Sequence, residues 1–194
     1  MTESEVLDLL QKVGAFRSGH FVFTHGRHSD SYVNKDALYP YTRDTSLLCK
    51  AMAERFADKG IEVVAGPTMG AAILAQLVAY HLSELTGKEV YGVYDDIVKG
   101  KKTLVVEDLT TTGGSIKKVV EVARAAGGDV VGAIAIVNRG GVTKEQVGDP
   151  PVFASLVELH LESWDESECE LCKKGIPVNT DIGHGREFAA KKGH

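Results

Sequence analysis

The segment from Thr103 to Ser115, TLVVEDLTTTGGS, constrains the fold more than any other part of the chain. Its first residues are apolar without polar alternation, which is typical of a parallel strand covered on both faces. A run of hydroxyl residues and two glycines follow, and then Val119, Val120 and Ala123 recur at helical spacing. A buried strand that leads through a glycine-rich turn into a helix predicts one unit of an α/β protein.

Strand and helix patterns alternate through the middle of the chain. Short apolar runs predict strands at 62–65, 90–94, 103–107 and 130–137. Helical spacing of apolar residues predicts helices at 44–59, 71–85 and 114–126. The repetition predicts an α/β fold with a doubly wound, mainly parallel sheet. Such sheets bind ligands outside the carboxyl ends of their strands, so we expect the functional residues there.

The length of 194 residues fits a single domain, large enough to bury a sheet between two layers of helices. We expect one domain over 1–194 with three parts: an N-terminal hood at about 1–40, a core at about 41–160 and a polar C-terminal tail at about 161–194. The hood is predicted to contain a flap-like helix at 3–14 and short strands at 21–23 and 31–34.

Composition excludes several functional classes. A net charge of −5 and a pI near 5.8 argue against a nucleic-acid or anionic-membrane surface, because both need clustered Lys and Arg. No apolar run approaches the roughly 18 residues of a membrane helix, and the acidic N-terminus is unlike a signal peptide. Three cysteines are too few for a disulfide framework and fit a reducing compartment. We therefore expect a cytoplasmic protein.

The residues after the central strand have the composition of an anion site. Gly113 and Gly114 let the backbone approach a ligand closely, neighbouring hydroxyls add donors, and the start of the helix adds positive potential. The pattern is not a Walker loop, because the lysine of GxxxxGK is missing, and it is not GxGxxG. Glu107 and Asp108 could accept hydrogen bonds from sugar hydroxyls or attract Mg²⁺. Alternatively, Asp108 and Thr110 only cap the following helix.

In this context TLVVEDLTTTGGS resembles the phosphoribosyl diphosphate (PRPP) motif of type I phosphoribosyltransferases, with Glu-Asp in place of the commoner Asp-Asp. The resemblance covers almost the whole chain and is closest to orotate phosphoribosyltransferases. It is carried by the segments 18–40, 63–82 and 136–141. It implies the type I phosphoribosyltransferase fold, a Mg²⁺-dependent transfer of ribose 5-phosphate from PRPP to orotate with release of diphosphate, and a homodimer.

The resemblance also implies the PRPP-binding residues. Glu107 and Asp108 would hold the ribose hydroxyls and support the positive ring of an oxocarbenium-like transition state, as the catalytic pair. No protein ligand for Mg²⁺ stands out, although Asp108 is a candidate. The complete predicted set for PRPP is Glu107, Asp108, Leu109, Thr110, Thr111, Thr112, Gly113, Gly114, Ser115, Thr68, Met69 and Gly70.

For the base, the resemblance implies that Arg139 contacts orotate, a flat anion that suits an in-plane cation. The remaining predicted base-binding residues are Thr111, Lys35, Tyr32, Arg27 and Ser29. Two alternatives stay open for these residues. Arg139 could be a solvated side chain at a strand end, and Asp30, Asp36 and Arg43 could form ordinary surface ion pairs with the hood residues.

The chain departs from the family pattern in two places. The diphosphate loop often contains a lysine, where this chain has Thr68, Met69 and Gly70. Relatives also have a long mobile loop that closes over the diphosphate, whereas here only residues 95–102 separate the strand at 90–94 from the PRPP motif. Either the gene lacks this loop, which would make a slow enzyme or a binding protein, or the printed sequence omits a stretch near Val93. Lys99, Lys101 and Lys102 could partly substitute, or could be solvated residues of a turn.

The tail contains a CxxC pair, Cys169 and Cys172. Such a pair is half of a zinc site, and His160 or His184 could supply further ligands. The alternative is two free thiols in a folded tail.

Two functions compete with orotate phosphoribosyl transfer. A phosphoribosyltransferase for a purine or another base would share the PRPP motif and differ in the hood. A non-catalytic protein that senses PRPP or a nucleotide would tolerate a missing closing loop.

Overall fold

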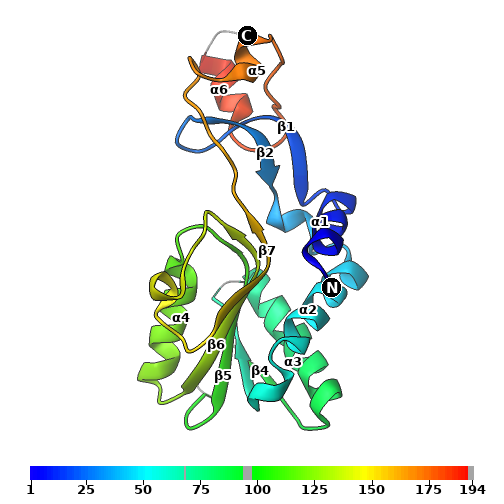
Figure 1. Cartoon of the computed structure of the whole chain (residues 1–194), viewed down its shortest axis with the longest axis vertical. Coiled ribbons are helices and arrows are strands. Elements are labelled where there is room, and N and C mark those ends of the chain that lie inside the picture. The colour runs from blue at the N-terminus through cyan, green and yellow to red at the C-terminus, as the bar shows by residue number, and fades with distance from the viewer. Residues whose placement is uncertain (68, 94–97, 192–194) are drawn as a thin grey trace.

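The computed structural model describes residues 1–67, 69–93 and 98–191 (Figure 1). The described α-helices are α1 (Glu3–Lys12), α2 (Thr42–Glu54), α3 (Met69–Thr86), α4 (Gly114–Ala125), α5 (Glu170–Lys173) and α6 (Gly185–Lys191). The strands are β1 (Phe16–Val22), β2 (His28–Val33), β3 (Val63–Ala65), β4 (Tyr91–Val93), β5 (Lys102–Thr110), β6 (Asp129–Arg139) and β7 (Phe153–Leu159). Short 3₁₀ helices are η1 (Lys35–Ala37), η2 (Ala57–Lys59) and η3 (Lys144–Val147).

Five of these strands form one parallel sheet in the order β4-β3-β5-β6-β7. β5, which begins the PRPP-like motif, pairs with β3 on one side and β6 on the other. The apolar runs predicted four of the five strands but not β7. β7 lies at the edge of the sheet and is only partly buried, so it lacks the continuous apolar run that marked the others.

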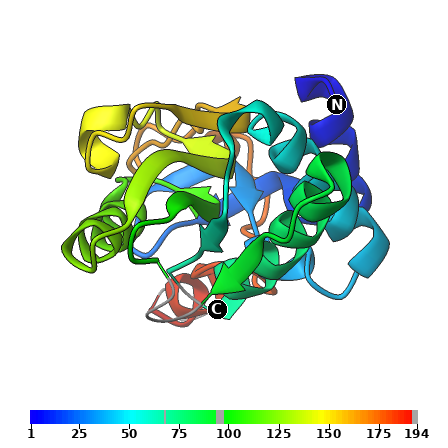
Figure 2. The same cartoon turned by 90° about the horizontal axis from the view of Figure 1, so that it is seen from below.

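Helices cover both faces of the sheet (Figure 2). On one face, Leu104 and Val106 of β5 pack in a hydrophobic cluster with residues of α1, α2 and α3. On the other face, Val105 packs with Ile116 and Val120 of α4. Successive residues of β5 therefore face opposite helical layers, as the pleat of a strand requires. The predicted doubly wound parallel sheet is confirmed.

The upper lobe, defined as β1, β2 and residues 161–191, lies apart from the sheet (Figure 1). β1 and β2 pair in antiparallel fashion. The backbones of His28 and Trp164 pair as an isolated bridge, and the N–H of Asn179 donates to the carbonyl of His20 at 2.7 Å. The hairpin of the predicted hood and the predicted tail thus form one structural unit.

Helix α1 packs on the core instead of in the upper lobe. Its buried face, Val6, Leu9 and Leu10, belongs to the same cluster as Leu48 of α2 and Leu156 of β7. The segment 1–40, which was predicted to form one hood, therefore divides at about residue 15: α1 packs on the core, and the β1–β2 hairpin belongs to the upper lobe. The reason is physical, because an amphipathic helix buries its apolar stripe against the largest apolar surface within reach.

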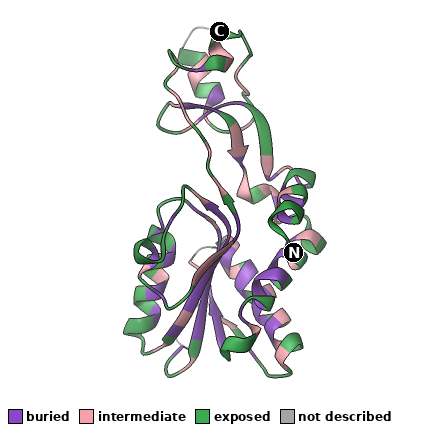
Figure 3. Ribbon diagram, in the orientation of Figure 1, coloured by how far each residue is buried: buried purple, intermediate pink, exposed green. Residues whose placement is uncertain are grey.

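Burial is uneven between the two parts (Figure 3). Fully buried residues concentrate on the sheet and on the helix faces that cover it, whereas the upper lobe is mostly exposed or half-buried. Among the described helices, none has the length and apolar character needed to span a bilayer.

Candidate active site

Two adjacent carboxylates are buried at the carboxyl end of β5. The exposed fractions of Glu107 and Asp108 are 4% and 3%. The N–H of Asp108 donates to Oε1 of Glu107 at 3.1 Å, and the N–H of Leu109 donates to Oδ1 of Asp108 at 2.6 Å. Backbone donors thus hold both side chains where the strand meets the following loop.

Asp108 also accepts hydrogen bonds from the segment that follows β2. Nζ of Lys35 lies 3.2 Å from Oδ2 of Asp108, and the hydroxyl of Tyr39 donates to the same oxygen. Sequence reasoning placed Lys35 in the base pocket and missed Tyr39. The only available signal for Tyr39 was its position within the segment that resembles the family hood.

Burial shifts the protonation of this cluster. Burial, followed by the nearby charge of Asp108, raises the pKa of Glu107 to about 7. Burial and the hydrogen bond to Asp108 raise the pKa of the Tyr39 hydroxyl, which stays protonated. Desolvation opposes the charge of Lys35, but attraction to Asp108 outweighs it and the pKa of Lys35 is raised. Glu107 is therefore the member of this cluster that titrates near neutral pH.

The loop between β5 and α4 is short and held open by glycine. Gly113 has a φ of +81°, and a Cβ there would lie 2.8 Å from the carbonyl oxygen of Gln146. Only glycine fits this conformation and space. Thr111, Thr112 and Ser115 are exposed around it. Their position at the start of the twelve-residue helix α4 gives an anion access to backbone N–H groups and to the positive end of the helix dipole.

The start of α3 approaches the same carboxylates. A Cβ on Gly70 would collide with the hydroxyl of Tyr39 and lie 3.0 Å from Oδ2 of Asp108. Met69 is 83% exposed, and Thr68 lies outside the described residues. Gly70, at the start of α3, thus lies beside Asp108, and the PRPP-binding roles of Thr68, Met69 and Gly70 stay predictions.

Arg139 ends β6 and faces the hairpin of the upper lobe. Its guanidinium carbon lies 5.4 Å from the centre of the Phe23 ring, which is 6.2 Å from the ring of Tyr32. Asn138 fixes the following turn, because its amide group exchanges two 2.9 Å hydrogen bonds with the backbone of Val142. Arg139 is therefore a positioned cation in contact with an aromatic ring. Phe23 was missed as a site residue, since an aromatic residue in a predicted strand has no distinctive spacing.

Comparison with known proteins assigns the family. No family model matches the chain. A curated orotate phosphoribosyltransferase of Caldanaerobacter subterraneus is 36% identical over 188 residues, covering 92% of this chain and 96% of that protein. The chain belongs to the orotate phosphoribosyltransferases.

Solved structures agree with this assignment. Orotate phosphoribosyltransferase of Mycobacterium tuberculosis in complex with inorganic phosphate is 27% identical with a TM-score of 0.67, covering 81% of this chain and 95% of that one. The same enzyme in complex with PRPP is 26% identical with a TM-score of 0.62, covering 81% and 96%. The family resemblance and the fold that it implied are confirmed.

Two of the base-binding residues predicted for an orotate phosphoribosyltransferase contact the tail. Arg27 donates to the hydroxyl and the carbonyl of Ser163 and pairs with Asp165 at 3.1 Å. The buried hydroxyl of Ser29 donates to the carbonyl of Glu162 at 2.8 Å. These contacts connect the hairpin to residues 162–165. The base-binding roles of Arg27 and Ser29 stay predictions.

The region of the family's closing loop includes residues 94–97, which lie outside the described residues. The lysines at 101 and 102 lie at the amino end of β5, opposite the carboxyl end that carries Glu107 and Asp108. Lys101 lies over the Tyr91 ring at 5.6 Å and 3.8 Å from Glu62, and Lys102 begins β5. Asp108 stands six positions after Lys102 in the same strand, about 20 Å at the rise of a β-strand. Lys101 therefore fits the interpretation as a turn residue, whereas Lys102 is a strand residue, and neither reaches a diphosphate at the acidic pair of its own chain.

Proposed function

We propose that this chain transfers the ribose 5-phosphate of PRPP to orotate, giving orotidine 5′-monophosphate and diphosphate. One observation carries the proposal. The buried carboxylates Glu107 and Asp108 stand immediately before a loop that Gly113 opens at the start of α4. Carboxylates accept hydrogen bonds from ribose hydroxyls, and the N–H groups at a helix start bind a phosphate monoester. The two adjoining features can therefore bind the sugar and the phosphate of one ribose phosphate.

In this proposal the protein acts by positioning and electrostatics. Backbone N–H groups and hydroxyls from Thr110 to Ser115 anchor the 5-phosphate, and the exposed start of α3 at Met69 and Gly70 lies along the diphosphate. Glu107 and Asp108 accept hydrogen bonds from the ribose hydroxyls. The negative charge of Asp108, joined by that of Glu107 when it is ionised, supports the positive ring as the bond from C1 to diphosphate breaks and a ring nitrogen of orotate bonds to C1.

The base is assigned to the side of the site that faces the upper lobe. Orotate is a flat anion, and Arg139 offers a planar cation already in cation–π contact with Phe23. Tyr32 extends this aromatic surface, and Lys35 adds a second positive charge beside Asp108. Thr111 follows β5 at the same edge of the sheet. This arrangement, together with family membership, supports orotate, and no observation favours a purine or a sensor role.

The donor chemistry of the site fits Mg²⁺. Carboxylate oxygens are the hard ligands that Mg²⁺ prefers, and Mg²⁺ commonly combines one or two of them with phosphate oxygens of the substrate. Asp108 is the candidate ligand on the protein. When bound, Mg²⁺ would neutralise charge on the departing diphosphate. Lys35 and Tyr39 orient Asp108 for this contact through their hydrogen bonds to Oδ2.

We propose a homodimer in the cytoplasm. Support for dimerisation comes from α3, where Met69, Ile73 and Tyr80 are exposed at spacings that place them on one side of the helix. Exposed large apolar residues in a row are typical of a protein interface. Support for a reducing compartment comes from the unpaired state of Cys49, Cys169 and Cys172. Light scattering of the wild type and of Ile73→Asp tests the dimer, which the variant should weaken.

The transferase assay separates the competing functions. Purified protein is incubated with PRPP, Mg²⁺ and one base at a time, and loss of orotate absorbance or formation of a nucleotide is followed. Turnover with orotate alone is expected, and Asp108→Asn should remove most of it. Turnover with a purine alone would support the other transferase. PRPP binding without turnover for any base would support the sensor.

The intact mass of the expressed protein tests the closing loop. A mass of 20.8 kDa means that the chain lacks a long loop near Val93, whereas a larger mass means that the printed sequence omits one.

A further inference from the structure

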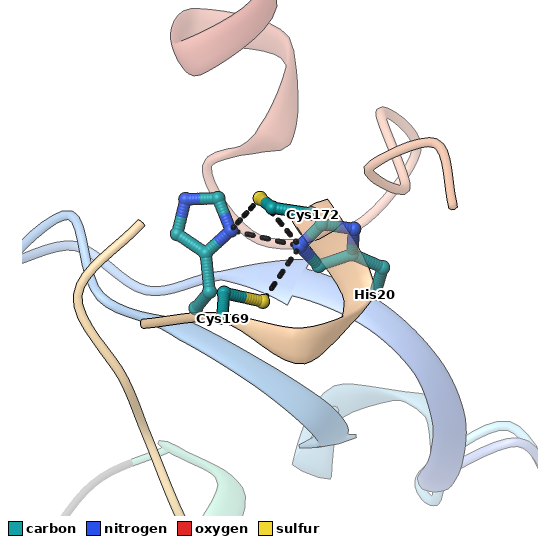
Figure 4. A group of neighbouring side chains, drawn as sticks. His20, Cys169 and Cys172 are labelled. Carbon is teal, nitrogen blue, oxygen red and sulfur yellow. Dashed lines mark hydrogen bonds between the residues drawn. The ribbon is translucent and has the colours of Figure 1, made fainter. Parts of the chain in front are cut away.

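Four metal-ligating side chains meet in the upper lobe, away from the acidic pair. Nitrogen atoms of His20 and His28 and the sulfur atoms of Cys169 and Cys172 all lie within 4.8 Å of one another. Figure 4 shows His20, Cys169 and Cys172 directed toward a common point. His20, His28 and Cys169 are buried and Cys172 is half-buried.

The separations of these atoms match a tetrahedral ion. Nε2 of His20 lies 3.5 Å from Sγ of Cys169 and 3.7 Å from Sγ of Cys172, and Nδ1 of His28 lies 3.4 Å from Sγ of Cys172. Zinc with bonds of about 2.0–2.1 Å to nitrogen and about 2.3 Å to sulfur places N and S about 3.6 Å apart. Nε2 of His20 and Nδ1 of His28 are 2.7 Å apart. Two nitrogen ligands of a tetrahedral zinc ion lie about 3.4 Å apart, so binding would lengthen this distance by about 0.7 Å. A small rotation of either ring is enough for this change.

The ring of His20 is oriented by a hydrogen bond on its far side. Nδ1 of His20 lies 2.7 Å from the carbonyl oxygen of Ile176, which can only accept. His20 therefore carries its proton on Nδ1 and directs the lone pair of Nε2 toward the cysteines. A backbone carbonyl behind a ligating imidazole is the usual second contact of a zinc histidine.

The chemistry of this set selects zinc. Two thiolates and two neutral imidazoles balance the double charge of Zn²⁺, which removes the cost of burying an isolated ion. Sulfur ligands select against Mg²⁺, which prefers carboxylate and phosphate oxygens. The cluster is therefore chemically distinct from the acidic pair.

The described residues of the upper lobe bury little apolar surface of their own. In the described residues from 161 to 191, Cys169 is the only side chain in the buried apolar core. Phe21, Val22 and Val33 of the hairpin are buried but lie outside the three hydrophobic clusters of the core. A unit with so little apolar burial needs a crosslink or a metal to hold its parts together.

We propose that His20, His28, Cys169 and Cys172 form a structural zinc site that fastens the tail to the β1–β2 hairpin. The two histidines come from the strands of the hairpin, and the two cysteines lie at the start and within the single turn of α5. The sequence offered the CxxC half of such a site as one of two alternatives, beside two free thiols. Its histidines are not His160 or His184, since His184 instead contacts Thr24 and Glu187.

Metal analysis of the full-length protein, purified under reducing conditions, tests this site. About one zinc per chain is expected after reconstitution with zinc and gel filtration. Cys172→Ser and His28→Asn should lower the zinc content at least about tenfold, consistent with the loss of one ligand from four. The matched control is Cys49→Ala, which removes the third cysteine from the core and should retain zinc. Zinc-free wild type, or equal zinc in Cys172→Ser and the wild type, would overturn the proposal.

A cobalt titration of the wild type keeps the test independent of variant folding. Co²⁺ in an S₂N₂ tetrahedral site gives thiolate charge-transfer bands and intense visible bands, and zinc added afterwards should abolish both. A chelator should speed proteolysis of the tail, and zinc but not Mg²⁺ should restore protection. Binding of Co²⁺ without thiolate bands, or a Cys169–Cys172 disulfide that persists in reductant, would refute the site.

Discussion

Nζ of Lys35 lies 3.2 Å from Oδ2 of Asp108, and this ion pair joins the segment after β2 to the carboxyl end of β5. Asp108 is 3% exposed at its side chain and Lys35 is 40% exposed. A cation that water can still reach therefore balances a buried carboxylate. We expect substrate phosphates to compete for Lys35 and Mg²⁺ to compete for Asp108 without unfolding the site.

Lys35→Met removes the cation and keeps the aliphatic stem. We expect the free energy of unfolding to fall by about 1–3 kcal/mol, because the buried carboxylate of Asp108 loses its cation while solvent screens part of the loss on the exposed side of Lys35. We expect kcat/KM for orotate to fall about tenfold or more, since a positive charge beside the base is lost. Urea denaturation and steady-state kinetics measure the two effects. Lys59→Met, whose lysine pairs with exposed Asp58, is the matched control and should change neither.

Tyr39→Phe removes the second donor to Asp108 without changing the packing of the ring. A buried carboxylate that loses a hydrogen bond should cost about 1–3 kcal/mol of stability. Chemical denaturation checks this value, with the exposed Tyr41→Phe as the control. Equal stability of the two variants would show that the hydroxyl of Tyr39 contributes nothing to the cluster.

Stability should decrease as pH rises through the range in which Glu107 titrates. The pKa of Glu107 is 4.5 in its ordinary state and about 7 in the folded chain. Between these values the folded chain keeps a proton that the unfolded chain has released, so its stability falls with increasing pH. Glu107→Gln cannot titrate and should have a flatter profile and higher stability above pH 7. Parallel profiles of wild type and Glu107→Gln from pH 4.5 to 7 would contradict the raised pKa.

Gly113→Ala and Gly114→Ala should differ although the two glycines are adjacent. Alanine at 113 needs a positive φ and meets the backbone of Gln146, so we expect a loss on the order of 2 kcal/mol. At 114 the nearest atom to a new Cβ is 3.7 Å away, so stability should be retained. Calorimetry for PRPP binding should show weaker affinity for Gly113→Ala by at least about tenfold. Similar unfolding curves for both variants would refute this account of the loop.

Arg139→Lys keeps the charge but loses the planar guanidinium that lies over the Phe23 ring. We expect KM for orotate to rise about tenfold, which is about 1.4 kcal/mol, while KM for PRPP stays unchanged. Steady-state kinetics with each substrate varied in turn separates the two constants. Arg17→Lys is the control, because Arg17 lies on β1 and donates to the carbonyl of Gly14 outside the site. A rise in KM for PRPP alone would contradict the assignment of Arg139 to the base.

Local patterns were sufficient for four of the five strands of the parallel sheet and for the strand, turn and helix that surround residues 107–115. Both depend on residues adjacent in the chain, where strand, turn and helix start follow one another. The contacts of Asp108 with Lys35 and Tyr39 join segments far apart in the sequence and have no local signal. The same is true of Arg139 on Phe23.

The strands of the hairpin show the same limit. Only 21–23 was predicted for β1, because Arg17, Ser18 and His20 do not form an apolar run. Their strand conformation comes from pairing with β2 and from contacts with the tail. The tail was recognised as a polar segment, but its place against the hairpin could not be read from composition.

The pairing of His28 with Trp164 has a consequence for protein synthesis. The hairpin emerges from the ribosome early, whereas its partner residues are translated after every strand of the parallel sheet. The sheet can therefore begin to fold before the residues that pair with the hairpin have been synthesised. Closure of the upper lobe, and with it the packing of Phe23 against Arg139, has to follow the synthesis of residues 161–191.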